Sequence, residues 1–428
     1  MTDFYRFERE LPELITDLAA AQVPDYFDDL LQRTARTRQR PAWSSLERWL
    51  PMGVVARPVL APPVPWRSIA ILAILALIAA AGAVIFVGSR PRLPEPFGPA
   101  ANGSVLVSTV DGDIYLVDPV LGASKPIVVG PETDVAPTFS RDGSMFMFLR
   151  HVDTNMDAVY VANSDGSRLR QILGGQFDLS RFEWSPSGTQ AAVVSMINGL
   201  HALSIVNIDG TASTTLDLGM NVVEVRWRPN RTELVFSAEK REGTAGLSYG
   251  FYVVHPDGTG LRPLLPVTTS TTDWMSPTLS PDGVRLAYAR WEPVLEGRIR
   301  LLEIDTGLDR RLEFEGAAGP ELHPLFSPDG SQLLFERYSP TEGYRVVVPP
   351  DYQLVVAPAE GGGPAVAIGP REPDFMEGAW TSFSPDGTKV LATYQSDKST
   401  WLLDVTGGQG QRVSWPTFAE GSWQRLAR

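Results

Sequence analysis

Residues 279–290, LSPDGVRLAYAR, contain the pattern that decides the fold of this chain. Ser280 to Gly283 are a turn sequence, because proline presets φ at the second position of a β-turn, aspartate tolerates the third position and glycine completes the turn. The residues that follow alternate between polar and apolar side chains, which is typical of a half-buried strand. The stretch therefore predicts two antiparallel strands joined by a tight turn.

The same pattern recurs along the chain at a nearly constant spacing. The other copies are Ser140-Arg-Asp-Gly143, Ser185-Pro-Ser-Gly188, Ser327-Pro-Asp-Gly330 and Ser384-Pro-Asp-Gly387, with Arg228-Pro-Asn-Arg231 as a degenerate copy. Successive copies start 45, 43, 52, 47 and 57 residues apart, a period typical of the four-stranded blade of a β-propeller. We assign a structural role in these turns to Asp142, Gly143, Pro186, Gly188, Pro281, Asp282, Gly283, Pro328, Asp329, Gly330, Pro385, Asp386 and Gly387.

The two ends of the repetitive region complement each other. Each copy follows an aromatic residue or leucine, namely Phe139, Trp184, Trp227, Leu279, Phe326 and Phe383. The region opens with SVLVSTVDGDIYLVD, which lacks such a first strand, whereas residues 421–426 supply one without its continuation. We expect the C-terminal strand to complete the N-terminal blade, because closure removes exposed sheet edges. The prediction is an all-β propeller over residues 102–428, with seven four-stranded blades; six blades are the alternative.

The repeats resemble the SPDG-type propeller repeats of the periplasmic TolB family, and the resemblance covers roughly residues 100–428. It implies a TolB-like, WD40-like propeller in the bacterial cell envelope. It says much less about function, because one fold carries many activities.

A hydrophobic segment precedes the repeats. Residues 68–89 contain no charged residue and, as a helix, would rise about 33 Å, enough to cross a bilayer. A Pro-rich linker over 51–67 leads to it, and a second linker covers 90–101. Seven arginines between residues 33 and 67 stand against Arg90 and Arg92 beyond it. The positive-inside rule therefore predicts a single-pass membrane protein with a cytoplasmic N-terminus and an extracytoplasmic propeller.

The first 50 residues show short apolar faces at helical spacing and predict a cytoplasmic helical segment. This layout, with the Asp25–Leu31 and Arg40–Trp43 neighbourhoods, weakly resembles membrane-bound anti-sigma factors. The resemblance implies a sigma factor as a possible cytoplasmic partner. The zinc ligands of one branch of those proteins are absent, and a plain anchor without a specific partner is the alternative.

Composition and motifs argue against catalysis. The absence of cysteine excludes disulfides and thiol chemistry, and a net charge of −13 argues against nucleic-acid binding. Gly246–Gly250 matches a nucleophile elbow around Ser248, but strands flank it. The four histidines, His151, His201, His255 and His323, lack metal-ligand spacing. We predict no catalytic residue, no cofactor site and no metal site.

Two further expectations concern the surface. Trp274, Trp291, Trp401 and Trp415 lie outside the register of the repeat and are expected to be more exposed than its aromatic residues. Residues 338–352 account for most of the longest spacing and are expected on one rim of the propeller, where loops bind partners.

Three functions follow as hypotheses. The leading one is a non-enzymatic binding or sensing module whose propeller takes a protein, peptide or glycan and which relays binding to a cytoplasmic partner. The alternative is a TolB-like envelope scaffold with a simple membrane anchor. A propeller-based hydrolase or lyase is the third.

Overall fold

The computed structural model describes residues 69–77, 94–153, 156–229, 231–241, 247–266, 275–292, 296–316, 319–339, 351–373, 378–408, 410–415 and 421–428. The chain separates into two compact units, Met1–Arg90 and Pro91–Arg428. The predicted N-terminal helices over residues 1–50 and the linker over 51–67 lie outside the described residues.

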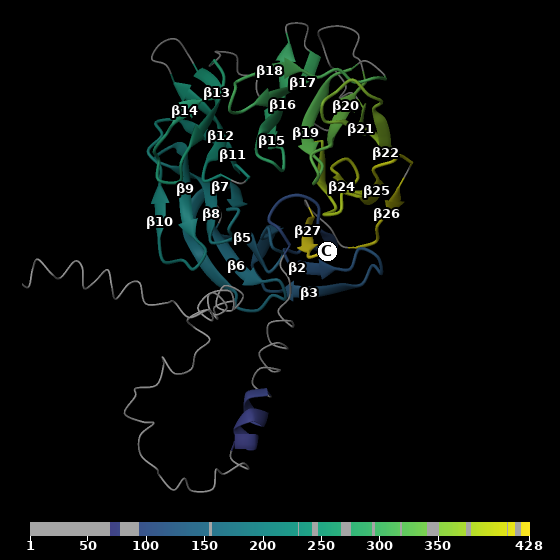
Figure 1. The fold of residues 1–428 in the computed structure, drawn as a ribbon. Coiled ribbons are helices and arrows are strands. Elements are labelled where there is room, and N and C mark those ends of the chain that lie inside the picture. The colour runs from purple at the N-terminus through teal and green to yellow at the C-terminus, as the bar shows by residue number, and fades with distance from the viewer. Residues whose placement is uncertain are drawn as a thin grey trace, which may run out of the picture. The chain divides into compact units, whose positions relative to one another are not determined.

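The second unit is a ring of β-sheets (Figure 1). The strands of the described residues form seven four-stranded antiparallel blades, which confirms seven rather than six. From the innermost strand outward, blade 1 contains β27 (Ser422–Leu426), β1 (Ala101–Ser108), β2 (Ile114–Val117) and β3 (Ser124–Val128). Blade 2 contains β4 (Thr133–Phe139), β5 (Met145–Asp153), β6 (Met156–Asn163) and the start of β7 (Arg170–Trp184). Blade 3 contains the end of β7, β8 (Gln190–Ile197), β9 (Leu200–Asn207) and β10 (Ser213–Thr215).

The remaining four blades each form a separate sheet in chain order. Blade 4 contains β11 (Asn221–Trp227), β12 (Leu234–Arg241), β13 (Leu247–Val254) and β14 (Arg262–Pro263). Blade 5 contains β15 (Met275–Leu279), β16 (Arg285–Glu292), β17 (Glu296–Glu303) and β18 (Asp309–Arg311). Blade 6 contains β19 (Glu321–Phe326), β20 (Gln332–Tyr338), β21 (Asp351–Pro358) and β22 (Val366–Pro373). Blade 7 contains β23 (Ala379–Phe383), β24 (Lys389–Tyr394), β25 (Thr400–Asp404) and β26 (Gln411–Arg412).

Two strands, β7 and β27, connect parts of the chain that belong to different blades or to opposite ends of the chain. The 15-residue strand β7 is the outermost strand of blade 2 and continues without a break into the innermost strand of blade 3. The last strand, β27, pairs antiparallel with β1, so that Trp423 lies opposite Val105 and Leu426 opposite Ala101. In Figure 1 the yellow β27 lies among the blue N-terminal strands. The expected closure of the ring by the C-terminal strand is therefore present.

The core consists of apolar layers between neighbouring blades. One layer, for example, packs Val194 and Leu203 of blade 3 against Val225, Trp227 and Phe236 of blade 4. Both faces of each blade meet a neighbour, so the second strands are apolar in continuous runs rather than in strict alternation. In blade 2 the run Phe146 to Phe148 is completely buried.

The repeated tetrapeptides form the turns between the first and second strand of a blade. In blade 2 the Ser140 hydroxyl donates to Asp142 Oδ1 at 2.7 Å and accepts from the amide of Met145 at 3.0 Å. Gly143 has φ +70°, and a Cβ there would also collide with the carbonyl oxygen of Arg425 in blade 1. Burial disfavours the ionised form of Asp142, but hydrogen bonds from Ser140 and Ser144 outweigh it and lower the pKa of this carboxyl.

A turn of the same kind joins the first two strands of blades 3, 5, 6 and 7. The Ser–Asp hydrogen bond recurs at Ser280–Asp282, Ser327–Asp329 and Ser384–Asp386, and Pro186 and Gly188 occupy the corresponding turn of blade 3. Pro281, Pro328 and Pro385 precede these aspartates, and Gly283, Gly330 and Gly387 follow with positive φ. All these turns lie at one face of the ring, which we call the turn face; the opposite face is the loop face.

Within the first unit, residues 69–77 form a helix. Among the residues that the structure describes, no helix has both the length and the apolar character needed to cross a bilayer. The predicted span over 68–89 extends beyond this helix, and its remainder lies outside the described residues.

Candidate functional site

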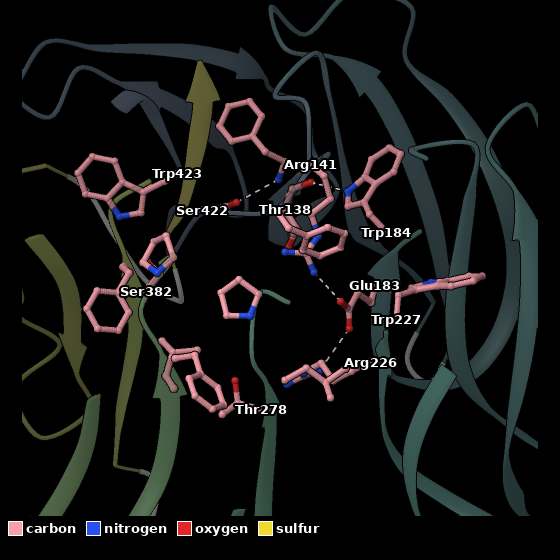
Figure 2. A pocket seen from close by; sticks show the side chains of 18 of the residues that line it. Thr138, Arg141, Glu183, Trp184, Arg226, Trp227, Thr278, Ser382, Ser422 and Trp423 are labelled. Atoms are coloured by element: carbon pink, nitrogen blue, oxygen red, sulfur yellow. Dashed lines mark hydrogen bonds and ion pairs between the residues drawn. The ribbon is translucent and has the colours of Figure 1, made fainter. Parts of the chain in front are cut away.

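The innermost strands of the seven blades surround a central channel with a volume of about 670 Å³. Figure 2 shows the hollow with side chains of several blades around it. The residue before each repeat aromatic lines this channel, and the aromatic side chain borders it too but is largely buried. The lining residues at this position are Thr138, Glu183, Arg226, Thr278, Leu325, Ser382 and Ser422.

Hydrogen bonds between adjacent inner strands hold the wall together. Trp184 donates its indole N–H to the carbonyl oxygen of Thr138 at 3.0 Å and so joins blade 3 to blade 2. The Ser422 hydroxyl accepts from the amide of Phe139 at 3.0 Å, and Ser382 donates to the carbonyl oxygen of Gly421 at 2.8 Å. Both bonds involve residues next to the chain closure, so the channel depends on β27 being in place.

Charged side chains gather on one arc of the wall. Arg141 donates to Glu183 Oε1 at 2.7 Å, and the other oxygen of Glu183 lies 3.9 Å from the guanidinium of Arg226. Arg226 also contacts Glu224 at 3.4 Å. Figure 2 shows Arg141, Glu183 and Arg226 directed toward one another on one side of the hollow. Because the partners come from blades 2, 3 and 4, this chain of ion pairs forms only when these three neighbouring blades pack together.

A buried carboxylate supports the wall at blade 6. Glu336 is 2% exposed and lies 2.8 Å from His323 Nδ1, while the Tyr338 hydroxyl donates to it at 2.7 Å. Its second oxygen accepts from the amide of Ala379 at 2.8 Å, which attaches blade 7. A carboxylate in this position orients an imidazole. Among the described residues, however, no three metal-ligating side chains gather into a metal site.

Three inner strands carry the same bulge. Each bulge has a non-glycine residue with positive φ followed by proline: Ala136-Pro137, Ser276-Pro277 and His323-Pro324. Such backbone is costly, by about 1–3 kcal/mol per residue, and bulges redirect side chains. All six residues line the channel, so the bulges shape its wall.

The segment that leads into β1 contacts the channel wall at the turn face. Phe97 lies under the guanidinium of Arg141, 4.9 Å from ring centre to Cζ. Arg425 donates to the carbonyl oxygens of Glu95 and Gly98 at 2.9 and 2.7 Å. Burial and the nearby Arg141 lower the pKa of Arg425 to about 10, so it stays protonated at neutral pH.

Of the candidate residues from the sequence, namely Ser248 and the four histidines, most lie away from the channel. Ser248 lies near the start of β13 in blade 4, is 2% exposed and donates to the carbonyl oxygen of Lys240, so no nucleophile elbow forms there. His151 contacts Asp157 on neighbouring strands of blade 2, and His201 and His255 lie in blades 3 and 4. Within the described residues His323 is the histidine that lines the channel.

The expectation for the tryptophans outside the repeat register was wrong for Trp415. It is 8% exposed and packs with Trp423 and Val105 at the closure, because it follows β26 of blade 7, the neighbour of blade 1 in the ring. Trp401 is partly buried. Outside the described residues lie Trp274, the side chain of Trp291 and residues 340–350 of the predicted rim insertion. The strands that flank this insertion meet it at the loop face, since β20 ends at Tyr338 and β21 begins at Asp351.

Sequence reasoning missed the charged arc and the Glu336 cluster. One local signal was present, since Glu183 and Arg226 immediately precede a repeat tryptophan and alternation along a strand turns them to the channel. Arg141 replaces the proline of the repeat, which was a second signal.

Comparison with known proteins supports a TolB-like propeller. No protein-family model matches the chain. A stretch of 174 residues, 39% of the chain, is 28% identical to the TolB homolog of Chlorobium luteolum and covers 36% of that protein's length. The chain therefore spans about a third of the curated relative that it matches.

Solved structures share the fold. The tricorn protease superposes with a TM-score of 0.53 at 11% identity, covering 79% of this chain and 36% of that one. An oligogalacturonate lyase in complex with manganese gives 0.50 at 14% identity, with 73% and 97% covered. TolB from Acinetobacter baumannii gives 0.44 at 13% identity, with 81% and 71% covered. At these identities the structures are similar in fold alone.

Proposed function

We propose that this chain is a TolB-like scaffold protein of the cell envelope, which binds a partner polypeptide in the channel of its propeller and has no enzymatic activity. The observation that carries the proposal is the channel of about 670 Å³, lined by charged, polar and apolar side chains of neighbouring blades. Its volume lies in the range of ligand-binding sites. The similarity to the TolB homolog of C. luteolum supports the scaffold role.

A channel-filling variant tests the binding site. Thr138 lines the channel on β4, and Thr214 is exposed on the outermost strand β10. We expect Thr138→Trp to abolish capture of partner peptides, and Thr214→Trp to leave it intact. Equal capture by both variants, with melting temperatures equal to the wild type, would place binding outside the channel.

The same proposal tethers the protein through residues 68–89, with residues 1–67 in the cytoplasm and the propeller outside. The uncharged stretch and its flanking arginines support a tether. The helix over 69–77 also exposes Ile71, Leu72 and Leu77 by 57%, 67% and 69%, and apolar side chains exposed together favour contact with lipid or a partner.

Because the chain contains no cysteine, single cysteines report this topology directly. Val120 is 89% exposed on the propeller, and Ser44 belongs to the N-terminal segment. We expect a membrane-impermeant maleimide to label Val120→Cys in intact spheroplasts and Ser44→Cys only after lysis. Labelling of both before lysis, or release of the protein from membranes by alkaline carbonate, contradicts the tether.

A relay to a cytoplasmic sigma factor is the second candidate. The Asp25–Leu31 and Arg40–Trp43 neighbourhoods favour it. Capture of a sigma factor by residues 1–50 supports the relay, and loss of that capture after alanine replacement of Tyr26 and Phe27 is its control.

A further inference from the structure

The wall of the channel has a charge opposite to that of the whole chain. Among the described residues that line it, four arginines stand against two glutamates: Arg141, Arg181, Arg226 and Arg425 against Glu183 and Glu224. The whole chain has a net charge of −13. An excess of positive charge thus lies inside an acidic protein, and concave low-dielectric walls concentrate its field.

The cations, rather than the anions, face the hollow. The side chains of Arg141 and Arg226 are 36% and 37% exposed, whereas those of Glu183 and Glu224 are 12% and 16% exposed. The glutamates therefore orient the guanidinium groups from behind. Guanidinium groups held in this way are suited to bind carboxylates through paired hydrogen bonds.

The opposite arc of the channel is free of charged lining residues within the described chain. Blades 5 to 7 contribute Pro277, Thr278, Leu279, Leu325 and Trp380 to it, besides His323. In Figure 2, Ser382 lies across the hollow from Glu183. A ligand that fills the channel thus meets guanidinium groups on one side and largely apolar surface on the other.

We infer that the channel binds an acidic peptide segment, with its carboxylates against Arg141 and Arg226 and its apolar side chains against Leu279, Leu325 and Trp380. The inference rests on the proposed function and names the chemistry of the partner. An oligosaccharide of uronic acids offers carboxylates too. It lacks the apolar side chains that the second arc would bury, so the peptide fits both arcs and the oligosaccharide only one.

The test selects short random peptides displayed on phage against the full-length protein in nanodiscs. We expect the enriched sequences to contain an excess of aspartate and glutamate. Synthetic versions of the best sequences, and counterparts with Asn and Gln in place of the acids, are then compared by calorimetry. The acidic form should bind at least about tenfold more tightly, and its affinity should fall as salt rises from about 0.1 M to about 1 M.

Charge reversal in the channel gives the matched comparison. Arg226→Glu changes the channel of blade 4, whereas Arg262→Glu makes the same change on the exposed outermost strand of that blade. We expect Arg226→Glu to weaken the acidic peptide at least about tenfold and Arg262→Glu to leave it within about twofold. Melting temperatures show whether both variants are folded. The salt dependence of binding to the wild-type protein tests the same charge interaction without any substitution.

The outcomes separate the two proposals. If the enriched peptides show no excess of acidic residues but lose binding to the Thr138→Trp variant, the ligand is not acidic and the channel is still the binding site. Peptides whose binding survives Thr138→Trp overturn both, as does recovery of no sequence above background. Tighter binding of oligogalacturonate than of every peptide replaces the peptide with a uronate oligosaccharide.

Discussion

The strongest structural prediction concerns the closure of the ring by β27. Removal of residues 421–428 deletes Trp423, which is 8% exposed and packs against Val105 and Trp415. Truncation of a buried tryptophan to alanine costs about 3–5 kcal/mol. The deletion also removes the hydrogen bonds of β27 to β1 and those of Arg425 and Ser422, each worth about 1 kcal/mol net.

These losses together approach the whole stability of a typical domain, about 5–15 kcal/mol. We therefore expect Trp423→Ala to lower the midpoint of guanidinium unfolding substantially, and the deletion to abolish the cooperative transition. Removal of Ala427 and Arg428 alone, which lie beyond β27, is the matched control and should change stability by less than about 0.5 kcal/mol.

A covalent closure tests the same reasoning in the opposite direction. Ala101 and Leu426 are paired across β1 and β27, and Leu426 is 42% exposed, so two cysteines there disturb little packing. The natural chain has no cysteine to compete. We expect the disulfide to stabilise the oxidised protein by about 2–4 kcal/mol, and reduction to remove the gain. If the protein lacking residues 421–428 unfolds at the same denaturant concentration as the full chain, the closure argument is refuted.

Three further predictions concern other parts of the ring. Arg228 is 1% exposed and pairs with Asp305, which is 46% exposed, so we expect Arg228→Ala to cost about 2–3 kcal/mol in urea unfolding, less than a fully buried broken pair. Arg231→Ala, which removes a more exposed contact to the same aspartate, should cost less than about 0.5 kcal/mol, and equal losses would contradict the role of burial. Burial raises the pKa of Asp386, but hydrogen bonds from Ser384 and Thr388 outweigh burial, so that the pKa in the folded protein lies below 3.8. The ionised carboxylate therefore stabilises the fold at a pH above the pKa of the unfolded chain, near 3.8. This contribution is lost as the pH falls through the lower pKa of the folded protein. Asp386→Asn should accordingly destabilise at about pH 7 and progressively less toward about pH 2, and a pH-independent difference in unfolding free energy would disprove this. Glu336→Gln weakens the bonds that attach blade 7, so thermal unfolding should show a loss of about 1.5–3 kcal/mol, and an unchanged melting temperature would count against it.

The channel could be predicted from sequence only in part. The repeat places one residue before each aromatic on the inner strand, and this position includes Glu183 and Arg226. Their partnership was not predictable, because Arg141 and Glu183 are 42 residues apart and meet only when blades 2 and 3 pack together. The bonds of Glu336 cross from blade 6 to blade 7 in the same way.

The number and order of the blades were determined by the sequence itself. The hydrogen bonds of the turn are local, because those of Ser280, Asp282 and Gly283 span only a few residues. Each copy of the repeat therefore marks a turn in the sequence without reference to the rest of the chain. The closing strand was also predictable. Residues 421–426 have the pattern of a first strand without a second, and the first blade has a second strand without a first.

Only the tertiary structure decided which side chains the ring brings together. Arg228 interrupts the repeat where other copies have serine, and its role became clear from Asp305, 77 residues away in the next blade. Trp415 lies outside the repeat register yet is buried at the closure. The charge of the channel arises likewise from residues on separate blades. Such contacts depend on the curvature of the whole ring, which no local pattern encodes.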